Sequence, residues 1–80
     1  MHPSQRPSLD EVRDWFAAAL THEALDAYLA LLDADPNWLV SARSSGATRL
    51  LQMYYYPKGE WLTVVLRDAG GRWRPDPLAQ

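Results

Sequence analysis

The spacing of apolar residues changes once along this chain, at Asp35-Pro36-Asn37, and this change constrains the fold more than any other feature. Before it, apolar residues recur every three or four positions, which is the period of an amphipathic helix. After it, β-branched and aromatic residues stand in short runs separated by glycine-containing turns, which is typical of antiparallel strands. Because helical and strand patterns are segregated along the sequence, we expect an α+β domain.

Two helices are expected in the first half of the chain. Ser8 followed by Glu11 is a capping-box pattern, and the apolar positions beyond it predict a first helix over residues 9–20. Thr21 is suited to cap a second helix over residues 22–33. The apolar stripe of this second helix is wide, which indicates burial against more than one neighbour.

Three strands are expected in the second half, over residues 38–43, 48–56 and 61–67. A fourth strand over residues 72–74 stays open, because the two prolines that follow it suit either an edge strand or a tail. The predicted order is therefore α-α-β-β-β with a possible further strand. Both helices are expected to pack on one face of a three- or four-stranded antiparallel meander.

The length of the chain fits one domain, which we assign to residues 1–80. Residues 1–7 hold two prolines and no periodic pattern, so they are interpreted as a loose N-terminal arm. Residues 75–80 are interpreted as a C-terminal tail. No apolar run is long enough to span a membrane, and the first residues lack the apolar core of a signal peptide. We therefore expect a cytoplasmic protein without a membrane partner.

The turn after the three tyrosines leaves two strand registers open, and a slip of one residue moves every side chain to the other face. A three-residue loop places Tyr56 opposite Glu60 and gives two faces of mixed character. An even-numbered loop places Tyr56 opposite Trp61 and makes one face apolar apart from a phenol hydroxyl. Two-residue loops at Ser45-Gly46 and Gly70-Gly71 agree with the even-numbered loop, so we prefer that register.

The preferred register predicts a sheet face that no helix covers. This face mixes aromatic rings, aliphatic side chains and arginines, and an exposed apolar surface of this kind indicates a partner. Tyr, Trp and Arg are also enriched at protein interfaces. The predicted interface residues are Leu39, Arg43, Leu50, Gln52, Tyr54, Tyr56, Trp61, Thr63, Val65, Arg67, Arg72 and Arg74.

Three kinds of partner fit the predicted face. A second copy is favoured, because two-fold dimers are the commonest oligomers and a small chain without cysteine gains stability from association. Another protein would use the same residues. Single-stranded nucleic acid could stack bases on the rings and meet the arginines with its phosphates. We expect a small interaction or regulatory protein, with a homodimer first and nucleic acid as the alternative.

Charge is divided unevenly between the halves of the chain. Residues 1–36 carry seven acids and two bases, whereas residues 37–80 carry three acids and six bases. The overall formal net charge of −2 therefore combines acidic helices with basic strands. The basic half supports nucleic-acid binding, but the acidic total and the lack of an RNA-binding motif argue against it.

Neither a catalytic site nor a metal site is expected. His22 and Asp26 are four residues apart in the second helix, but no third metal ligand is in view. Asp33 and Asp35 have the spacing of paired carboxylates and are interpreted as helix-end and turn residues. The glycine pair at 70–71 precedes no helix and so forms no phosphate loop. We expect no enzyme activity and no cofactor.

The segments Phe16–Leu20 and Leu25–Pro36, followed by Trp38-Leu39-Val40, resemble the opening helices of the NTF2-like (SnoaL-like) family. The resemblance implies helices before a curved sheet that encloses a ligand pocket, with dimerisation through the outer face of the sheet. It keeps a small-ligand-binding domain as a further alternative. The chain is short of that family's usual strands and additional helix, and no site residue is carried over.

Overall fold

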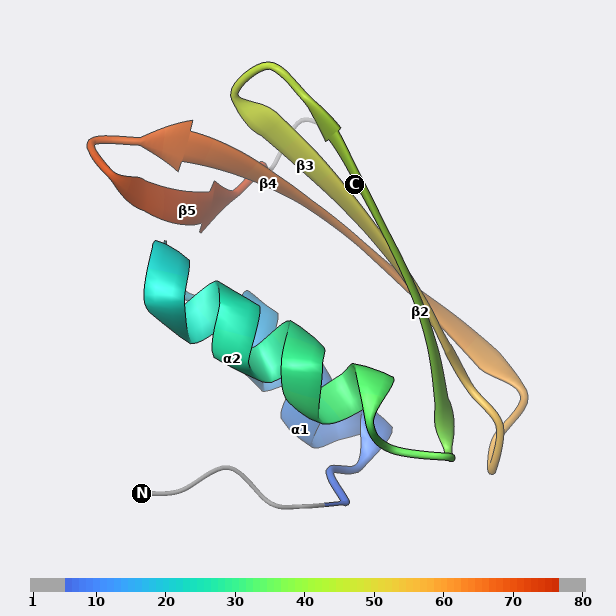
Figure 1. Cartoon of the computed structure of the whole chain (residues 1–80). Coiled ribbons are helices and arrows are strands. Elements are labelled where there is room, and N and C mark those ends of the chain that lie inside the picture. Colours follow the sequence, from blue (N-terminus) through green and yellow to red (C-terminus); the bar gives the residue numbers. More distant parts are fainter. Residues whose placement is uncertain (1–5, 77–80) are drawn as a thin grey trace.

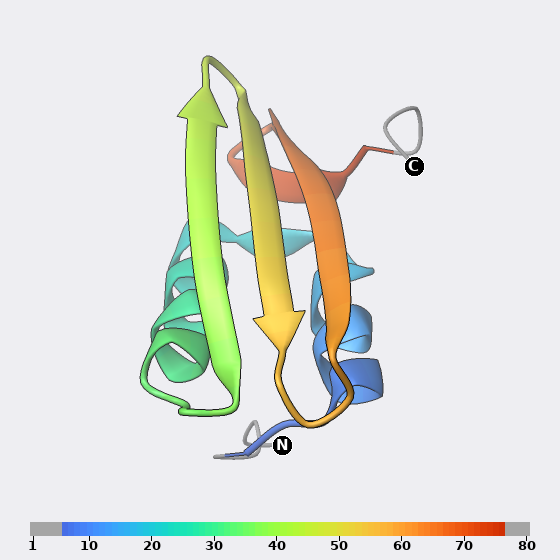
Figure 2. The same cartoon turned by 90° about the vertical axis from the view of Figure 1, so that its right-hand side faces the viewer.

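The computed structural model describes residues 6–76, and its sheet has five strands rather than the expected three or four. Strands β1 to β5 are all paired antiparallel, in the spatial order β1-β5-β4-β3-β2. Both helices lie on one side of this sheet (Figures 1 and 2). The α+β class is therefore confirmed. In chain order the elements are α1 (Leu9–Phe16), β1 (Leu20–Thr21), α2 (His22–Asp33), β2 (Trp38–Ser45), β3 (Thr48–Tyr55), β4 (Glu60–Ala69) and β5 (Arg72–Pro75).

The first helix is shorter than its apolar period predicts. It ends at Phe16 and not at residue 20, and Leu20 and Thr21 form a short strand that pairs with β5. The alanines at 17–19 favour a helix locally. The pairing of β1 with β5 and the burial of Leu20, which is 6% exposed, override that preference. The prediction of consecutive helices was therefore wrong at this point.

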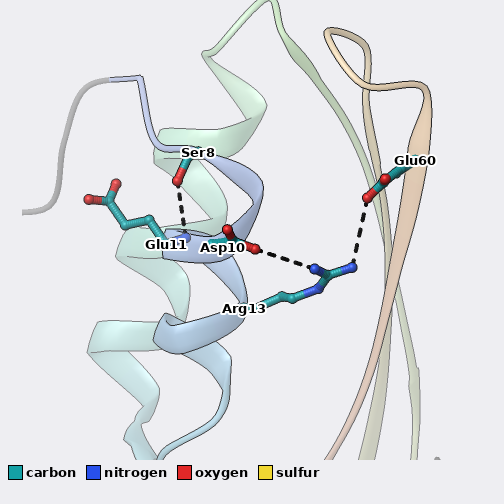
Figure 3. Close-up of polar contacts among 5 residues, drawn as sticks. All are labelled: Ser8, Asp10, Glu11, Arg13 and Glu60. Atoms are coloured by element: carbon teal, nitrogen blue, oxygen red, sulfur yellow. Dashed lines mark hydrogen bonds and ion pairs between the residues drawn. The ribbon is translucent and has the colours of Figure 1, made fainter.

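Both helices begin at the predicted cap residues. The Glu11 N–H donates to Ser8 Oγ at 3.2 Å, and the Ala24 N–H donates to Thr21 Oγ1 at 3.0 Å. Figure 3 shows the first of these bonds at the start of α1. Each cap satisfies an N–H group that has no partner within its helix. The second helix covers residues 22–33 as predicted.

One exposed side chain connects α1 to the sheet. The Arg13 guanidinium lies 3.4 Å from Asp10 Oδ1 on its own helix and 3.9 Å from Glu60 Oε2 at the start of β4 (Figure 3). All three side chains are about half exposed or more. Ion pairs of this kind contribute little to stability, roughly 0–1 kcal/mol, so the position of α1 depends on its buried residues.

The residues immediately before α1 are held by the core rather than loose. Pro7 is buried, and its carbonyl oxygen accepts the Trp38 indole N–H at 3.3 Å. The rest of the predicted arm, at residues 1–5, lies outside the described residues. At the other end, Pro75 is the last residue of β5 and not the first residue of a tail, and residues 77–80 also lie outside the described range.

Glycine decides where the first hairpin turns. Gly46 has φ of 60° and is the first of two loop residues, as in a type II′ turn. The loop is therefore Gly46-Ala47 and begins one residue later than the Ser45-Gly46 loop expected from the sequence. As a result Val40 lies opposite Met53, and not opposite Leu51.

In the second hairpin, too, a glycine with positive φ fixes the position of the turn. Gly59 has φ of 63°, and its N–H donates to the Tyr55 carbonyl oxygen at 2.9 Å. It closes a four-residue loop over 56–59, so Tyr54, not Tyr56, lies opposite Trp61. The three-residue loop is thus excluded. Relative to the register preferred from the sequence, the β3 partner of Trp61 shifts by two positions. An even shift preserves the predicted division of residues between the two faces of the sheet.

The third hairpin turns at Gly70-Gly71 as predicted, and Asp68 lies opposite Trp73. Both glycines have positive φ, of 64° and 80°, as a type I′ turn requires. The strand over 72–74 that the sequence left open is therefore present. It lies between β4 and β1.

The core lies between the helices and the sheet and takes most of the aromatic rings. Trp15 stacks on Tyr28 and Trp38 lies against Tyr55, each at a ring-centroid distance of 4.6 Å. No helix within residues 6–76 is long and apolar enough to cross a membrane. The buried apolar residues are Leu9, Val12, Phe16, Leu20, Leu25, Leu32, Trp38, Leu51, Met53, Leu62, Val64 and Leu66.

Candidate interaction face

The side of the sheet that points away from the helices is here called the open face. Successive side chains of a strand point to opposite sides, and the helix-side residues Leu51, Met53 and Leu66 are fully buried while their neighbours are exposed or half-buried. Figure 2 looks at this side, with the helices behind the sheet. The register places the predicted interface residues on the open face, except Tyr56, which lies in the adjoining turn.

One end of the open face is a cluster of large apolar side chains, which we call the aromatic end: Leu39, Tyr54, Tyr56 and Trp61. Three of them, Leu39, Tyr56 and Trp61, are 51%, 55% and 59% exposed. The Tyr54 ring lies between the other two rings, with centroid distances of 5.1 Å to Tyr56 and 5.0 Å to Trp61. Because the rings already contact one another, they have less side-chain freedom to lose when a partner covers them.

The turn between β3 and β4 shapes the aromatic end. A Cβ atom at Gly59 would lie 3.3 Å from the Tyr54 hydroxyl oxygen, which is closer than ordinary van der Waals contact. The missing side chain at this position therefore lets the Tyr54 ring extend over the turn. The register preferred from the sequence places the loop at 57–60 and Tyr54 opposite Thr63, so it gave Gly59 no such role.

The other end of the open face carries guanidinium groups, and we call it the arginine end: Arg43, Arg67, Arg72 and Arg74. Arg67 and Arg74 are cross-strand partners on β4 and β5. Arg67 also pairs with Asp76 Oδ2 at 3.3 Å. Within residues 6–76, the other three arginines make no ion pair. This end therefore carries an excess of positive charge.

Asp76 is a residue of this face that sequence reasoning missed. It was assigned to the tail, yet its N–H donates to the Val65 carbonyl oxygen at 2.8 Å, which continues the pairing of β5 with β4. The alternation that places Arg72 and Arg74 on the open face also places Asp76 there. That alternation was the available signal, and the neighbouring prolines concealed it.

On β3 and β4, a polar row and an aliphatic pair lie between the two ends of the face. Ser41, Gln52 and Thr63 form the row, and Leu50 and Val65 are the cross-strand pair beside it. Trp61 and Arg67 are six residues apart on β4, which corresponds to about 20 Å along a strand. On β4 the ring and the guanidinium are therefore well separated. On β2, by contrast, Arg43 is the cross-strand partner of Leu50, and Lys58 lies in the same turn as Tyr56.

The histidine and carboxylate that share a face of α2 do not form a site together. His22 Nε2 lies 3.5 Å from Asp68 Oδ2, and the His22 ring lies 5.3 Å from that of Trp73. Asp26 instead pairs with Arg49 at 3.5 Å. The two residues thus contact different strands, and both contacts hold α2 to the sheet.

The other carboxylate pair also has a structural role. Asp35 is buried, and its Oδ1 accepts the Asn37 N–H at 2.9 Å, which agrees with its interpretation as a turn residue. Asp33 is exposed at the end of α2. In the part of the chain that the structure describes, no group of three or more His, Cys, Asp or Glu residues is placed to hold a metal ion.

Comparison of the chain with protein-family models, with curated proteins and with solved structures finds no match. The resemblance of the helices to the NTF2-like family gains no support from these comparisons. The geometry and chemistry of the open face are therefore the features that indicate a function for this chain.

Proposed function

We propose that the protein is a small non-enzymatic interaction or regulatory domain that self-associates through its open face. The observation that carries this proposal is the aromatic end, where Leu39, Tyr56 and Trp61 are each more than half exposed. Exposed apolar clusters on a small domain mark interaction surfaces. Burying such surface contributes about 25 cal/mol for each Å².

A second copy is the partner that the size of the chain favours. A domain of 9.1 kDa has a thin core, and without cysteine it has no disulfide to add stability. Association of two open faces would bury their exposed apolar side chains and add a second apolar layer, on the side of the sheet away from the helices. A closed two-fold dimer is the commonest outcome of such association.

The double variant Tyr54→Ala, Trp61→Ala tests this proposal. Both changes remove rings from the aromatic end without touching the buried core, so we expect the far-UV circular dichroism of the native chain and loss of the dimer. Sedimentation equilibrium measures the mass. The matched control is Glu23→Ala, at an exposed position on α2, which should leave the dimer intact.

Three outcomes would contradict the proposal in different ways. A double variant that remains dimeric would show that the interface lies elsewhere. A double variant that unfolds as a monomer would show that these rings belong to the core rather than to a surface. A native chain that sediments at 9.1 kDa would contradict self-association itself.

Single-stranded nucleic acid is the second candidate, favoured by the three arginines of the arginine end that make no ion pair within residues 6–76. Titration of the native chain with single-stranded oligonucleotides at two salt concentrations, followed by tryptophan fluorescence, tests it. Quenching that weakens at the higher salt concentration would support phosphate contacts. Absence of quenching, or quenching that salt does not change, would argue against it.

A further inference from the structure

We infer that the outer edge of β2 is a site where an extended segment of another protein adds as a further antiparallel strand. The segment that fits this edge carries an acidic residue followed, four positions later, by a large apolar residue. Addition of a strand to an exposed sheet edge is a recurring mode of peptide recognition, in which backbone hydrogen bonds give affinity and alternate side chains give specificity. The edge is distinct from the open face, and its partner is a different protein from the second copy of the proposed function.

The two edges of the sheet differ in length. One edge is β1, which has only two residues, whereas the other is β2, which has eight and runs along one side of the sheet in Figure 2. Every residue of β2 has a partner on β3 without a bulge, and the strand contains neither proline nor lysine. Short length, bulges, prolines and lysines are features that protect edge strands from pairing with other chains. The strand β2 has none of them.

Alternate backbone groups of β2 point away from β3. The Tyr56 N–H donates to the Asn37 carbonyl oxygen at 2.9 Å, so the backbone groups of Asn37 point toward β3. Because these groups alternate in direction along an antiparallel strand, those of Val40, Ala42 and Ser44 point outward. In the part of the chain that the structure describes, no other strand or loop bonds to them. Each of the three residues thus offers an N–H and a carbonyl oxygen to an added strand.

The side chains of β2 on the open face set the chemistry of the partner. Leu39 is 51% exposed, and Arg43 is exposed and makes no ion pair within residues 6–76. They are four residues apart, with the small side chain of Ser41 between them. An antiparallel segment runs in the opposite direction, so its residue opposite Arg43 comes four positions before its residue opposite Leu39. A carboxylate at the first position and an apolar side chain at the second complement both.

The second half of β2 is accessible from both sides of the sheet. Residues 41–45 are all exposed, and the side chains of Ala42 and Ser44, on the helix side, are small. An added strand lies in the plane of the sheet, about 4.8 Å from its neighbour. It therefore leaves the open face accessible to a second copy, so that both contacts can form in one molecule.

A designed peptide tests the chemistry of the partner. The sequence Thr-Glu-Val-Thr-Val-Leu-Thr places its Glu opposite Arg43 and its Leu opposite Leu39, and a fluorescent label at its start reports binding through anisotropy. We expect binding that weakens by roughly tenfold when Lys replaces Glu in the peptide, because like charges then meet. The Arg43→Glu variant should reverse this preference and bind the Lys peptide more tightly. A preference that does not change in this variant, or no binding of either peptide by the native chain, would overturn the inference.

Proline at one position tests the backbone contact. Ala42→Pro removes only an N–H that points outward, so it leaves the pairing of β2 with β3 in place, and it should weaken binding of the Glu peptide by at least roughly tenfold. Ala42→Val keeps that N–H and is the matched control, which should bind as the native chain does. Equal binding by the two variants, both with native far-UV circular dichroism, would contradict strand addition.

Amide hydrogen exchange of the native chain gives a readout that needs no variant. With the Glu peptide bound, exchange should slow at Val40, Ala42 and Ser44, because their N–H groups gain acceptors. Slowing confined to other residues would place the peptide elsewhere and overturn the inference. Slow exchange at the same three amides without peptide, increasing with the concentration of the chain, would show that a second copy occupies the edge, and it would overturn the inference as well.

Discussion

Tryptophans on the two sides of the sheet have different roles at the scale of single residues. Trp38 is 4% exposed and donates its indole N–H to the Pro7 carbonyl, whereas Trp61 is on the open face. We expect Trp38→Phe to lower the free energy of unfolding by about 1–3 kcal/mol, because the buried Pro7 oxygen loses its donor. Urea denaturation of the dilute, monomeric chain measures this. Trp61→Phe is the control, with an expected change within about 0.5 kcal/mol.

Two glycines with similar backbone angles differ in what surrounds them. Gly46 and Gly59 have φ of 60° and 63°, but only at Gly59 would a Cβ meet a neighbour, the Tyr54 hydroxyl. Alanine at either position should destabilise the fold by roughly 1 kcal/mol. Gly59→Ala should in addition weaken self-association, because it displaces a ring of the aromatic end. Equal dimer dissociation constants for the two variants would contradict this role of Gly59.

The short strand β1 shows what sequence patterns omit at the scale of elements. Two residues, Leu20 and Thr21, are too few to show a period, and the alanines before them favour a helix. By contrast, the second helix was predicted with its bounds. The faces of the hairpins were also predicted, because they require only that each loop have an even number of residues. In the first two hairpins the strand partners were displaced by two positions, since the glycine φ values decide where each loop starts, whereas the third hairpin has the predicted partners.

Thr21 links β1 to α2, because it pairs with Arg72 of β5 and its hydroxyl caps the helix. Thr21→Ala should lower the free energy of unfolding by about 1 kcal/mol, through loss of the cap bond to the Ala24 N–H. Thr21→Ser keeps a hydroxyl that accepts the same bond and should retain most of the stability. Thermal unfolding of both variants measures the difference. Equal losses in the two would mean that strand pairing, and not the cap, accounts for the effect.

At the scale of the whole molecule, most acids lie on the helix side of the sheet, and four of the arginines lie on the open face. The acids of residues 10–35 lie on or beside the helices, and four arginines lie on the open face. Alternation along the sequence predicted which strand residues lie on this face, but it missed Asp76 and assigned to a strand Tyr56, which lies in a turn. It did not predict the division into two ends, because that division depends on which residues are cross-strand partners.

The mass of the native chain in solution tests the central claim, that a second copy covers the open face. Light scattering at tens of micromolar should give about twice the chain mass of 9.1 kDa, and dilution should return the value to that of one chain. The concentration dependence distinguishes a closed dimer from an open assembly, whose mass would continue to rise. A mass of 9.1 kDa at every concentration would contradict the account.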